Sequence, residues 1–136
     1  DAFAAAPEIK LTSKACPRFV EFVENGITSG KDILFVAKEY LGQLSETGID
    51  TVVLGCTHFP LLTGVIGYTL GPDVAIVSSA DETAQDLYRV LVSKNLLSEN
   101  EASKASHKFL VTGEKDNFAK LAKRFLGPEV TGVETI

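Results

Sequence analysis

The 136-residue sequence contains no methionine and no tryptophan, and it has only two cysteines, Cys16 and Cys56. Two cysteines alone do not form a disulfide framework, and without a C-x-x-C pair they indicate neither a zinc site nor a redox dithiol. We therefore expect a reducing, cytoplasmic location. Because the chain starts at Asp1 and lacks methionine, we also expect it to begin partway through a larger protein.

Long apolar runs and an excess of basic residues are missing as well. No segment approaches the roughly 20 apolar residues of a membrane span, and no basic segment followed by an apolar one marks a secretory signal. The net charge is -5. Since phosphate backbones and anionic lipids are normally met by basic surfaces, the sequence predicts neither a nucleic acid nor a membrane as partner. The chain is 45% hydrophobic, which suits one packed domain of ordinary size.

The chain is organised around IDTVVLGCTHFPLL, residues 49–62. The short, mostly β-branched run at 51–54 is ended by a glycine, which is typical of a buried strand in a parallel sheet. Cys56, Thr57 and His58 follow immediately. They are therefore expected just past the carboxyl end of a strand, where ligands bind in open α/β sheets.

The rest of the sequence alternates between strand and helix patterns. We expect further strands at 8–15, 74–77, 108–112 and 130–133. We expect helices from Pro17 to Gly26, from an N-cap at Ser29 to about 47, and at 60–70, 80–92 and 116–125; residues 1–6 resemble a helix end. This order predicts an α/β fold with a mainly parallel sheet and helices on both faces. The polar stretch 93–106 is expected to be a surface loop.

The chemistry centres on Cys56, Thr57 and His58. A thiol has a reference pKa of about 8.5, and an imidazolium or a helix N-terminus stabilises its thiolate. His58 is placed to tune the thiol or to carry a proton, and Thr57 offers an N–H and a hydroxyl for a carboxylate. Three alternatives stay open: a cysteine that only packs, a histidine with a structural hydrogen bond, and nucleophilic acyl transfer. No spaced set of three or four ligands indicates a metal.

Three more polar side chains call for an interpretation. Cys16 precedes Pro17, and we expect it to be a packing residue. Glu21 and Glu24 lie three residues apart on one helix face. Either both are solvated, or one of them points into a cleft beside the strand ends.

VVLGCTHFPLL, residues 52–62, closely resembles the second cysteine signature of the cofactor-independent aspartate/glutamate racemases. ACPRFVEFVENG at 15–26 resembles the family's ACP segment with its following glutamate, and VSSADETA at 77–84 resembles the start of its next helix. The histidine after Cys-Thr is similar to that of glutamate racemases, because aspartate racemases more often carry an acidic residue there.

The resemblance implies a two-base proton exchange at Cα of glutamate, without pyridoxal phosphate or metal, that supplies D-glutamate for peptidoglycan. It makes Cys56 one of two catalytic cysteines. Thr57 and His58 match substrate-contacting positions, His58 also matches the residue that assists Cys56, and Glu24 matches the glutamate that supports that histidine. The implied partner is glutamate. The oligomeric state is left open, with a homodimer among the alternatives.

The family's pattern also includes an N-terminal half with an Asp-Ser pair, a Tyr-Gly pair and a first cysteine in a Cys-Asn motif, and this sequence has none of them; Cys16 matches the ACP position instead. The family fold is pseudo-symmetric, with the site between two α/β domains. Residues 1–92 are then expected to form most of the second domain, 93–106 a crossover loop, and 107–136 a return into the first. We expect such a chain to be inactive alone. Two alternatives remain: a racemase of aspartate or another small acid, and a non-catalytic remnant that binds an acidic ligand or partner.

Overall fold

A computed structural model describes residues 8–98 and 106–136 of the chain. The helix end expected at 1–6 lies outside the described residues. Residues 99–105 of the loop expected at 93–106 lie outside them as well. The chain divides into two compact units, residues 1–79 and 80–136, and each is described by itself.

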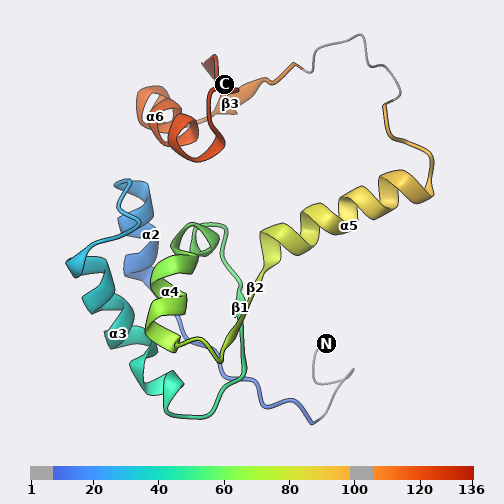
Figure 1. Ribbon diagram of the computed structural model, residues 1–136. Coiled ribbons are helices and arrows are strands. Elements are labelled where there is room, and N and C mark those ends of the chain that lie inside the picture. Colours follow the sequence, from blue (N-terminus) through green and yellow to red (C-terminus); the bar gives the residue numbers. More distant parts are fainter. Residues whose placement is uncertain (1–7, 99–105) are drawn as a thin grey trace. The chain divides into compact units, whose positions relative to one another are not determined.

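The first unit is built around two parallel strands. Its elements are α2 (Pro17–Glu24), α3 (Lys31–Ser45), β1 (Thr51–Leu54), the 3-10 helix η1 (Phe59–Leu62), α4 (Thr63–Leu70) and β2 (Ala75–Ser78) (Figure 1). Strands β1 and β2 pair in parallel, in a register that starts with Thr51 opposite Ala75 and ends with Leu54 opposite Ser78. The expected strand at 51–54 and the α/β class with parallel strands are therefore confirmed.

Local sequence signals account for most helix limits in this unit. Pro17 occupies the first turn of α2, where a missing N–H costs no hydrogen bond. The predicted N-cap at Ser29 is wrong, because the N-cap of α3 is Gly30. Its φ of 115° is a backbone conformation that glycine alone adopts readily, so the chain turns into the helix one residue later than expected.

The predicted strand at 8–15 is also wrong, since residues 9–16 form no regular element. The alternation of apolar and polar residues favours an extended chain, but a strand also needs a partner for its backbone groups. In the described part of the chain, β1 pairs only with β2, and no strand pairs with the segment before α2.

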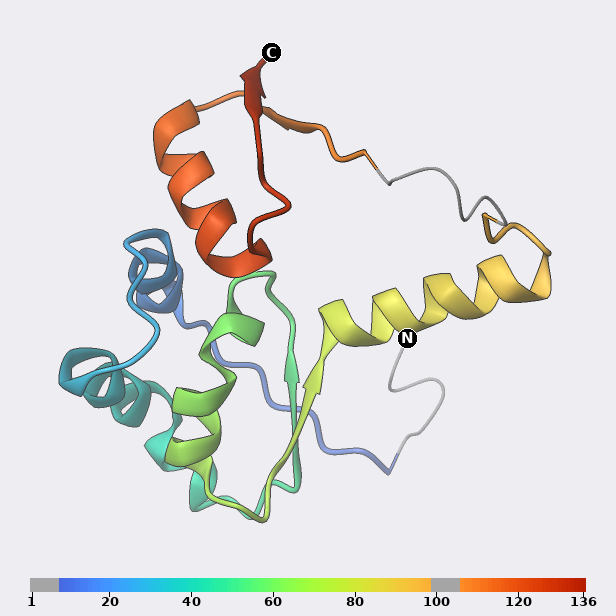
Figure 2. The ribbon, with the colours of Figure 1, turned by 45° about the horizontal axis from the view of Figure 1, so that its top comes forward.

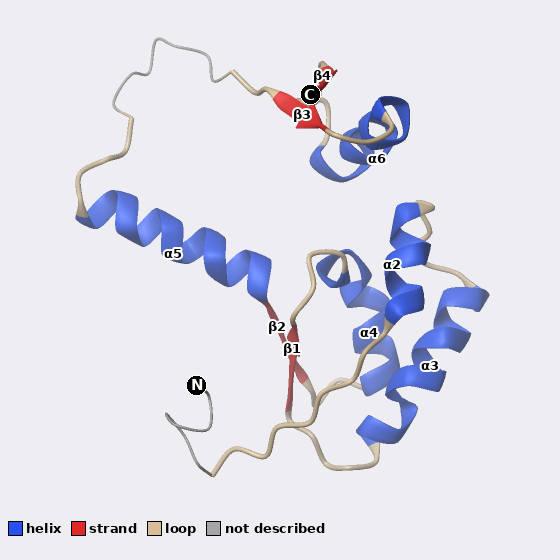
Figure 3. Ribbon diagram, turned by 180° about the vertical axis from the view of Figure 1, so that it is seen from behind, coloured by secondary structure: helices blue, strands red, loops and turns tan. Residues whose placement is uncertain are grey.

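Helices α2, α3 and α4 lie on one side of the β1–β2 pair (Figure 3). The buried positions of α3 recur at helical spacing and form one apolar stripe. Phe19 of α2 is 1% exposed, and its ring meets Tyr40 of α3 and Phe59 of η1 edge to face, at centroid distances of 5.4 and 5.7 Å. Phe19 therefore joins α2 both to α3 and to the segment that follows β1. The largest fully buried side chains of this unit are Phe19, Ile33, Val36, Leu54, Leu62 and Ile66.

The second unit contains a strand–helix–strand motif, in which α6 (Lys115–Leu126) connects β3 (Phe109–Val111) to β4 (Val133–Thr135) (Figure 2). These strands also pair in parallel, with Phe109 opposite Val133. The last strand begins three residues later than predicted, because Val130 instead enters the small core with Ala122 and Val133.

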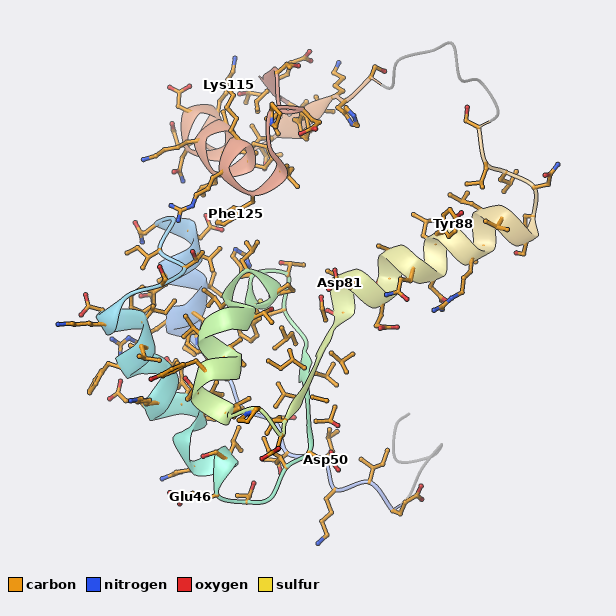
Figure 4. The ribbon with its side chains drawn as sticks, in the orientation of Figure 1. Glu46, Asp50, Asp81, Tyr88, Lys115 and Phe125 are labelled. Atoms are coloured by element: carbon orange, nitrogen blue, oxygen red, sulfur yellow. The ribbon has the colours of Figure 1, made fainter. Side chains whose placement is uncertain are left out.

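Helix α5 (Ser79–Ser93) runs from the end of the first unit into the second and has no buried residue. Tyr88, for example, extends from it with 61% of its surface exposed (Figure 4). No helix in residues 8–98 and 106–136 combines the length and the apolar character needed to cross a membrane.

Replacing Phe19 by alanine should lower the free energy of unfolding of the chain by about 3–5 kcal/mol, because it removes a buried aromatic ring and leaves a cavity. The matched control is Phe35→Ala, at a helical phenylalanine that is 62% exposed, where we expect a change within about 0.5 kcal/mol. Denaturant titration followed by circular dichroism measures both. Similar losses for the two variants would contradict the described core.

Candidate active site

The candidate site is the turn between β1 and η1. Strand β1 ends at Leu54, and the Phe59 N–H donates to the Cys56 carbonyl over 3.2 Å, which closes the turn that carries Cys56 and His58. From the first residue of α5, directly after β2, the hydroxyl of Ser79 donates to the Leu54 carbonyl over 2.8 Å. The backbone on both sides of Cys56 is therefore held by hydrogen bonds.

Three side chains meet in a row at this turn. His58 Nε2 lies 2.6 Å from Glu24 Oε1, and His58 Nδ1 lies 3.9 Å from Cys56 Sγ. The Thr57 hydroxyl is 3.4 Å from the same Nδ1. The structure thus brings together all four residues that the sequence singled out for the site, across 34 positions of the chain. What each of them does stays a prediction.

The geometry defines which way protons can move. The Glu24 carboxylate accepts from Nε2, so the Nε2–H tautomer is favoured when the ring is neutral, and Nδ1 is then an acceptor facing the Cys56 thiol. When the ring is protonated, Nδ1–H faces the sulfur and stabilises a thiolate. In both states the imidazole links a sulfur to a carboxylate, which is the arrangement of a proton relay.

Helix α2 determines that Glu24, and not Glu21, reaches the histidine. Glu24 is the last residue of the helix, and the Phe19–Phe59 contact seats that helix against η1. Arg18 ties the other end of α2 to α3, because its guanidinium lies 3.1 Å from Glu39. One of the two glutamates therefore contacts the turn after β1, while its side chain stays 52% exposed.

The two cysteines have different surroundings. Cys16 is 5% exposed, its thiol lies 3.7 Å from the Lys14 carbonyl, and burial raises its pKa. It is a packing residue, as predicted, and it carries no charge near neutral pH. Cys56 is only partly buried. A groove of about 620 Å³ next to β1 is lined by both cysteines among other residues, so Cys56 borders open space.

Sequence reasoning missed two residues that support the site. The sequence assigns Phe59 no role beyond its place in the segment 52–62, yet its ring anchors the turn on Phe19. Ser79 directly precedes the helix expected at 80–92, and its hydroxyl reaches Leu54, 25 residues away. The neighbouring sequence does not predict the contact between Ser79 and Leu54, because that contact depends on the pairing of β1 with β2.

Replacing Glu24 by alanine should release the neutral His58 ring from the Nε2–H tautomer, because its carboxylate acceptor is lost. Two-bond proton–nitrogen NMR spectra, recorded at a pH where the ring is neutral, distinguish the tautomers. Glu21→Ala is the matched control on the same helix and should leave the tautomer unchanged. Since Glu24 is 52% exposed, its loss should cost the fold no more than about 1 kcal/mol. An unchanged tautomer in Glu24→Ala would remove Glu24 from the relay.

The chain was compared with families, curated proteins and solved structures. No family model matches it. It is 54% identical over 136 residues to a glutamate racemase of Acidothermus cellulolyticus, covering 100% of this chain and 52% of that protein. It is 50% identical over 136 residues to a glutamate racemase of Mycobacterium ulcerans, of which it covers 50%.

The fold gives the same result. The crystal structure of glutamate racemase isoform RacE1 from Bacillus anthracis superposes with a TM-score of 0.87 at 36% identity, over 98% of this chain and 49% of that one. A glutamate racemase from Francisella tularensis, solved in complex with D-glutamate, superposes with a TM-score of 0.86 at 30% identity and the same coverage. By sequence and by fold, therefore, the chain is similar to glutamate racemases, and it spans about half the length of the relatives it matches.

Proposed function

We propose that this chain carries one catalytic half of a glutamate racemase, which interconverts L- and D-glutamate without a cofactor. The observation that carries the proposal is the row Glu24–His58–Cys56 at the carboxyl end of β1. A sulfur, an imidazole and a carboxylate within hydrogen-bonding reach form a relay for moving a proton to or from the thiol. The product, D-glutamate, would serve peptidoglycan synthesis.

The proposed reaction breaks one C–H bond and forms another. The Cys56 thiolate takes the α-proton from one face of glutamate, and the electron pair of the broken bond stays on Cα and its carboxylate. A second thiol, supplied from outside this chain, gives a proton to the opposite face, and the product has the inverted configuration. In the reverse direction the two sulfurs exchange roles. Because the α-proton is very weakly acidic, the site must stabilise the developing carbanion in a water-poor cleft.

Within this half, each residue has one task. His58 takes the proton from the Cys56 thiol through Nδ1, and Glu24 stabilises the imidazolium that forms. Thr57 holds the substrate carboxylate with its N–H or its hydroxyl. Cys16 takes no part in the transfer, because it is buried and its pKa is raised.

Two observations support glutamate as the substrate. The relatives at 50–54% identity are named glutamate racemases, and the Francisella neighbour was solved with D-glutamate. His58 follows Cys56 and Thr57, where aspartate racemases more often carry an acidic residue. The division into residues 1–92, 93–106 and 107–136, the cytoplasmic location and the homodimer stay predictions, and none of them is needed for the relay.

In the product of the complete reading frame, Cys56→Ala should lower the rate of glutamate racemisation by at least about 100-fold, because it removes an acid/base group from the chemical step. Circular dichroism of L- and D-glutamate solutions follows the reaction in both directions. Cys16→Ala is the matched control and should retain activity. Racemisation by the Cys56→Ala protein at the unaltered rate would overturn the assignment, and faster turnover of aspartate than of glutamate would overturn the substrate.

The 136-residue chain by itself should not racemise glutamate, because a single thiol serves only one face of Cα. Proton NMR in deuterated water measures the loss of the α-proton signal from L- and from D-glutamate. We expect exchange above that of buffer for at most one enantiomer, because only one face of Cα meets a thiol. Exchange of both enantiomers by the isolated chain would contradict the half-site.

A further inference from the structure

One nitrogen of the His58 ring is fixed, and the other is shared between two partners. Nε2 lies 2.6 Å from Glu24 Oε1, a short contact that holds this side of the ring. Nδ1 lies 3.4 Å from the Thr57 hydroxyl and 3.9 Å from Cys56 Sγ. Both of these distances are long for a hydrogen bond, so neither partner holds Nδ1 alone. The ring therefore has a firm contact at Nε2 and two competing partners at Nδ1.

The two partners exclude each other, because Nδ1 makes one strong hydrogen bond in each protonation state. In the neutral Nε2–H tautomer, Nδ1 has a single lone pair, which accepts either from the hydroxyl or from the thiol. In the imidazolium, Nδ1 has a single N–H, which donates either to the hydroxyl oxygen or to a thiolate. In both states, a bond between Thr57 and His58 is made at the expense of the bond between Cys56 and His58.

The charged groups around the turn do not decide between the hydroxyl and the sulfur. Helix α2 packs against η1, and α4 follows η1 directly. In α2, Glu24 contacts Nε2, Glu21 is exposed, and Arg18 is paired with Glu39 at the other end of the helix. The one ionisable side chain of α4, Tyr68, is 73% exposed. The carboxylate at Nε2 stabilises the imidazolium whichever partner Nδ1 has.

Solvent exposure indicates which of the two partners a ligand displaces. Thr57 is exposed, whereas Cys56 is partly buried beside β1. A carboxylate that arrives from solvent therefore meets the Thr57 hydroxyl. A hydrogen bond to a charged acceptor is roughly twice as strong as one to a neutral acceptor. Since Nδ1 of the neutral ring is a neutral acceptor at a long distance, the hydroxyl turns to the carboxylate and leaves Nδ1 to the thiol.

We propose that Thr57 is a positioning residue, whose hydroxyl keeps His58 from acting on Cys56 until a carboxylate binds. The inference rests on the proposed function, because the carboxylate is that of the amino-acid substrate. Once the hydroxyl donates to it, the thiol gives its proton to Nδ1 and the sulfur keeps the electron pair of the S–H bond. Glu24 stabilises the imidazolium that forms. The reactive thiolate is thus produced when a substrate is bound.

Alkylation of Cys56 in the 136-residue chain tests the competition at Nδ1. Iodoacetamide reacts with the thiolate, and mass spectrometry of the peptides counts Cys56 separately from Cys16. Thr57→Val removes the hydroxyl and keeps the shape of the side chain. At neutral pH, the rate at Cys56, relative to its plateau at high pH, should rise about 2- to 10-fold, the change that one hydrogen bond supports.

Two further variants separate the hydroxyl from a general change of structure. Thr57→Ser keeps a hydroxyl and should restore the unaltered rate. Thr63→Val makes the same substitution at a nearby exposed threonine, whose hydroxyl donates to the Pro60 carbonyl over 2.7 Å, and should leave the rate unchanged. The proposal is wrong if Thr57→Val does not raise the rate, or if Thr63→Val raises it equally.

The pH profiles of the complete protein test the displacement by substrate. The profile of kcat/KM reports ionisations of the free protein, and that of kcat reports those of its complex with substrate. In Thr57→Val, the acidic limb of kcat/KM should move to lower pH, because the thiolate forms more readily. The acidic limb of kcat should stay, because bound glutamate has already displaced the hydroxyl. Equal shifts in both profiles, or a shift in neither, would overturn the proposal.

These measurements separate the inference from the proposed function, because alkylation needs no racemisation. A faster alkylation of Cys56 in Thr57→Val, together with no racemisation by the complete protein, would refute the enzyme and leave the competition at Nδ1 in place. Racemisation that Cys56→Ala abolishes, together with unchanged alkylation in Thr57→Val, would refute only the role of the Thr57 hydroxyl.

Discussion

The contact between Phe19 and Phe59 fixes helix α2 against the turn that carries Cys56 and His58. The bond between Glu24 and His58 is half exposed, and such a pair contributes at most about 1 kcal/mol, too little to hold a helix in place. The buried ring of Phe19 supplies that fixation, because it joins α2 to the turn after β1. Glu24 lies on the same helix as Phe19, and His58 is the neighbour of Phe59. Packing thus places the two groups, and the hydrogen bond only aligns them.

The first unit contains two cysteines with different surroundings. Cys16 and Cys56 border the same groove, yet one is buried with a raised pKa and the other is accessible beside an imidazole. The same residue type is therefore part of the packed core in one place and lies partly exposed next to a histidine in the other. This difference follows from position: Cys16 precedes a helix that covers it, and Cys56 follows a strand whose end stays open.

The sequence predicts a helix or strand correctly where the signals for that element lie within a few neighbouring residues. The run at 51–54 and the helix started by Pro17 were predicted because composition and end signals lie within a few residues. The strand at 8–15 failed because pairing depends on a partner that a local pattern does not contain. The choice between Glu21 and Glu24 was open for a related reason, since only the seating of α2 on η1 decides which carboxylate reaches His58. The resemblance to a known family singled out Glu24, the glutamate that lies 2.6 Å from His58, which residue spacing alone did not; its role stays a prediction.

The hydroxyl of Ser79 links the start of α5 to the end of β1. Helix α5 begins at the residue after β2 ends, so no loop separates strand from helix. The Ser79 side chain accordingly bonds the Leu54 carbonyl at the position where the next ladder bond would fall. At this junction a side-chain hydrogen bond from Ser79 therefore continues the strand pairing by one position. It holds the end of β1 two residues before Cys56.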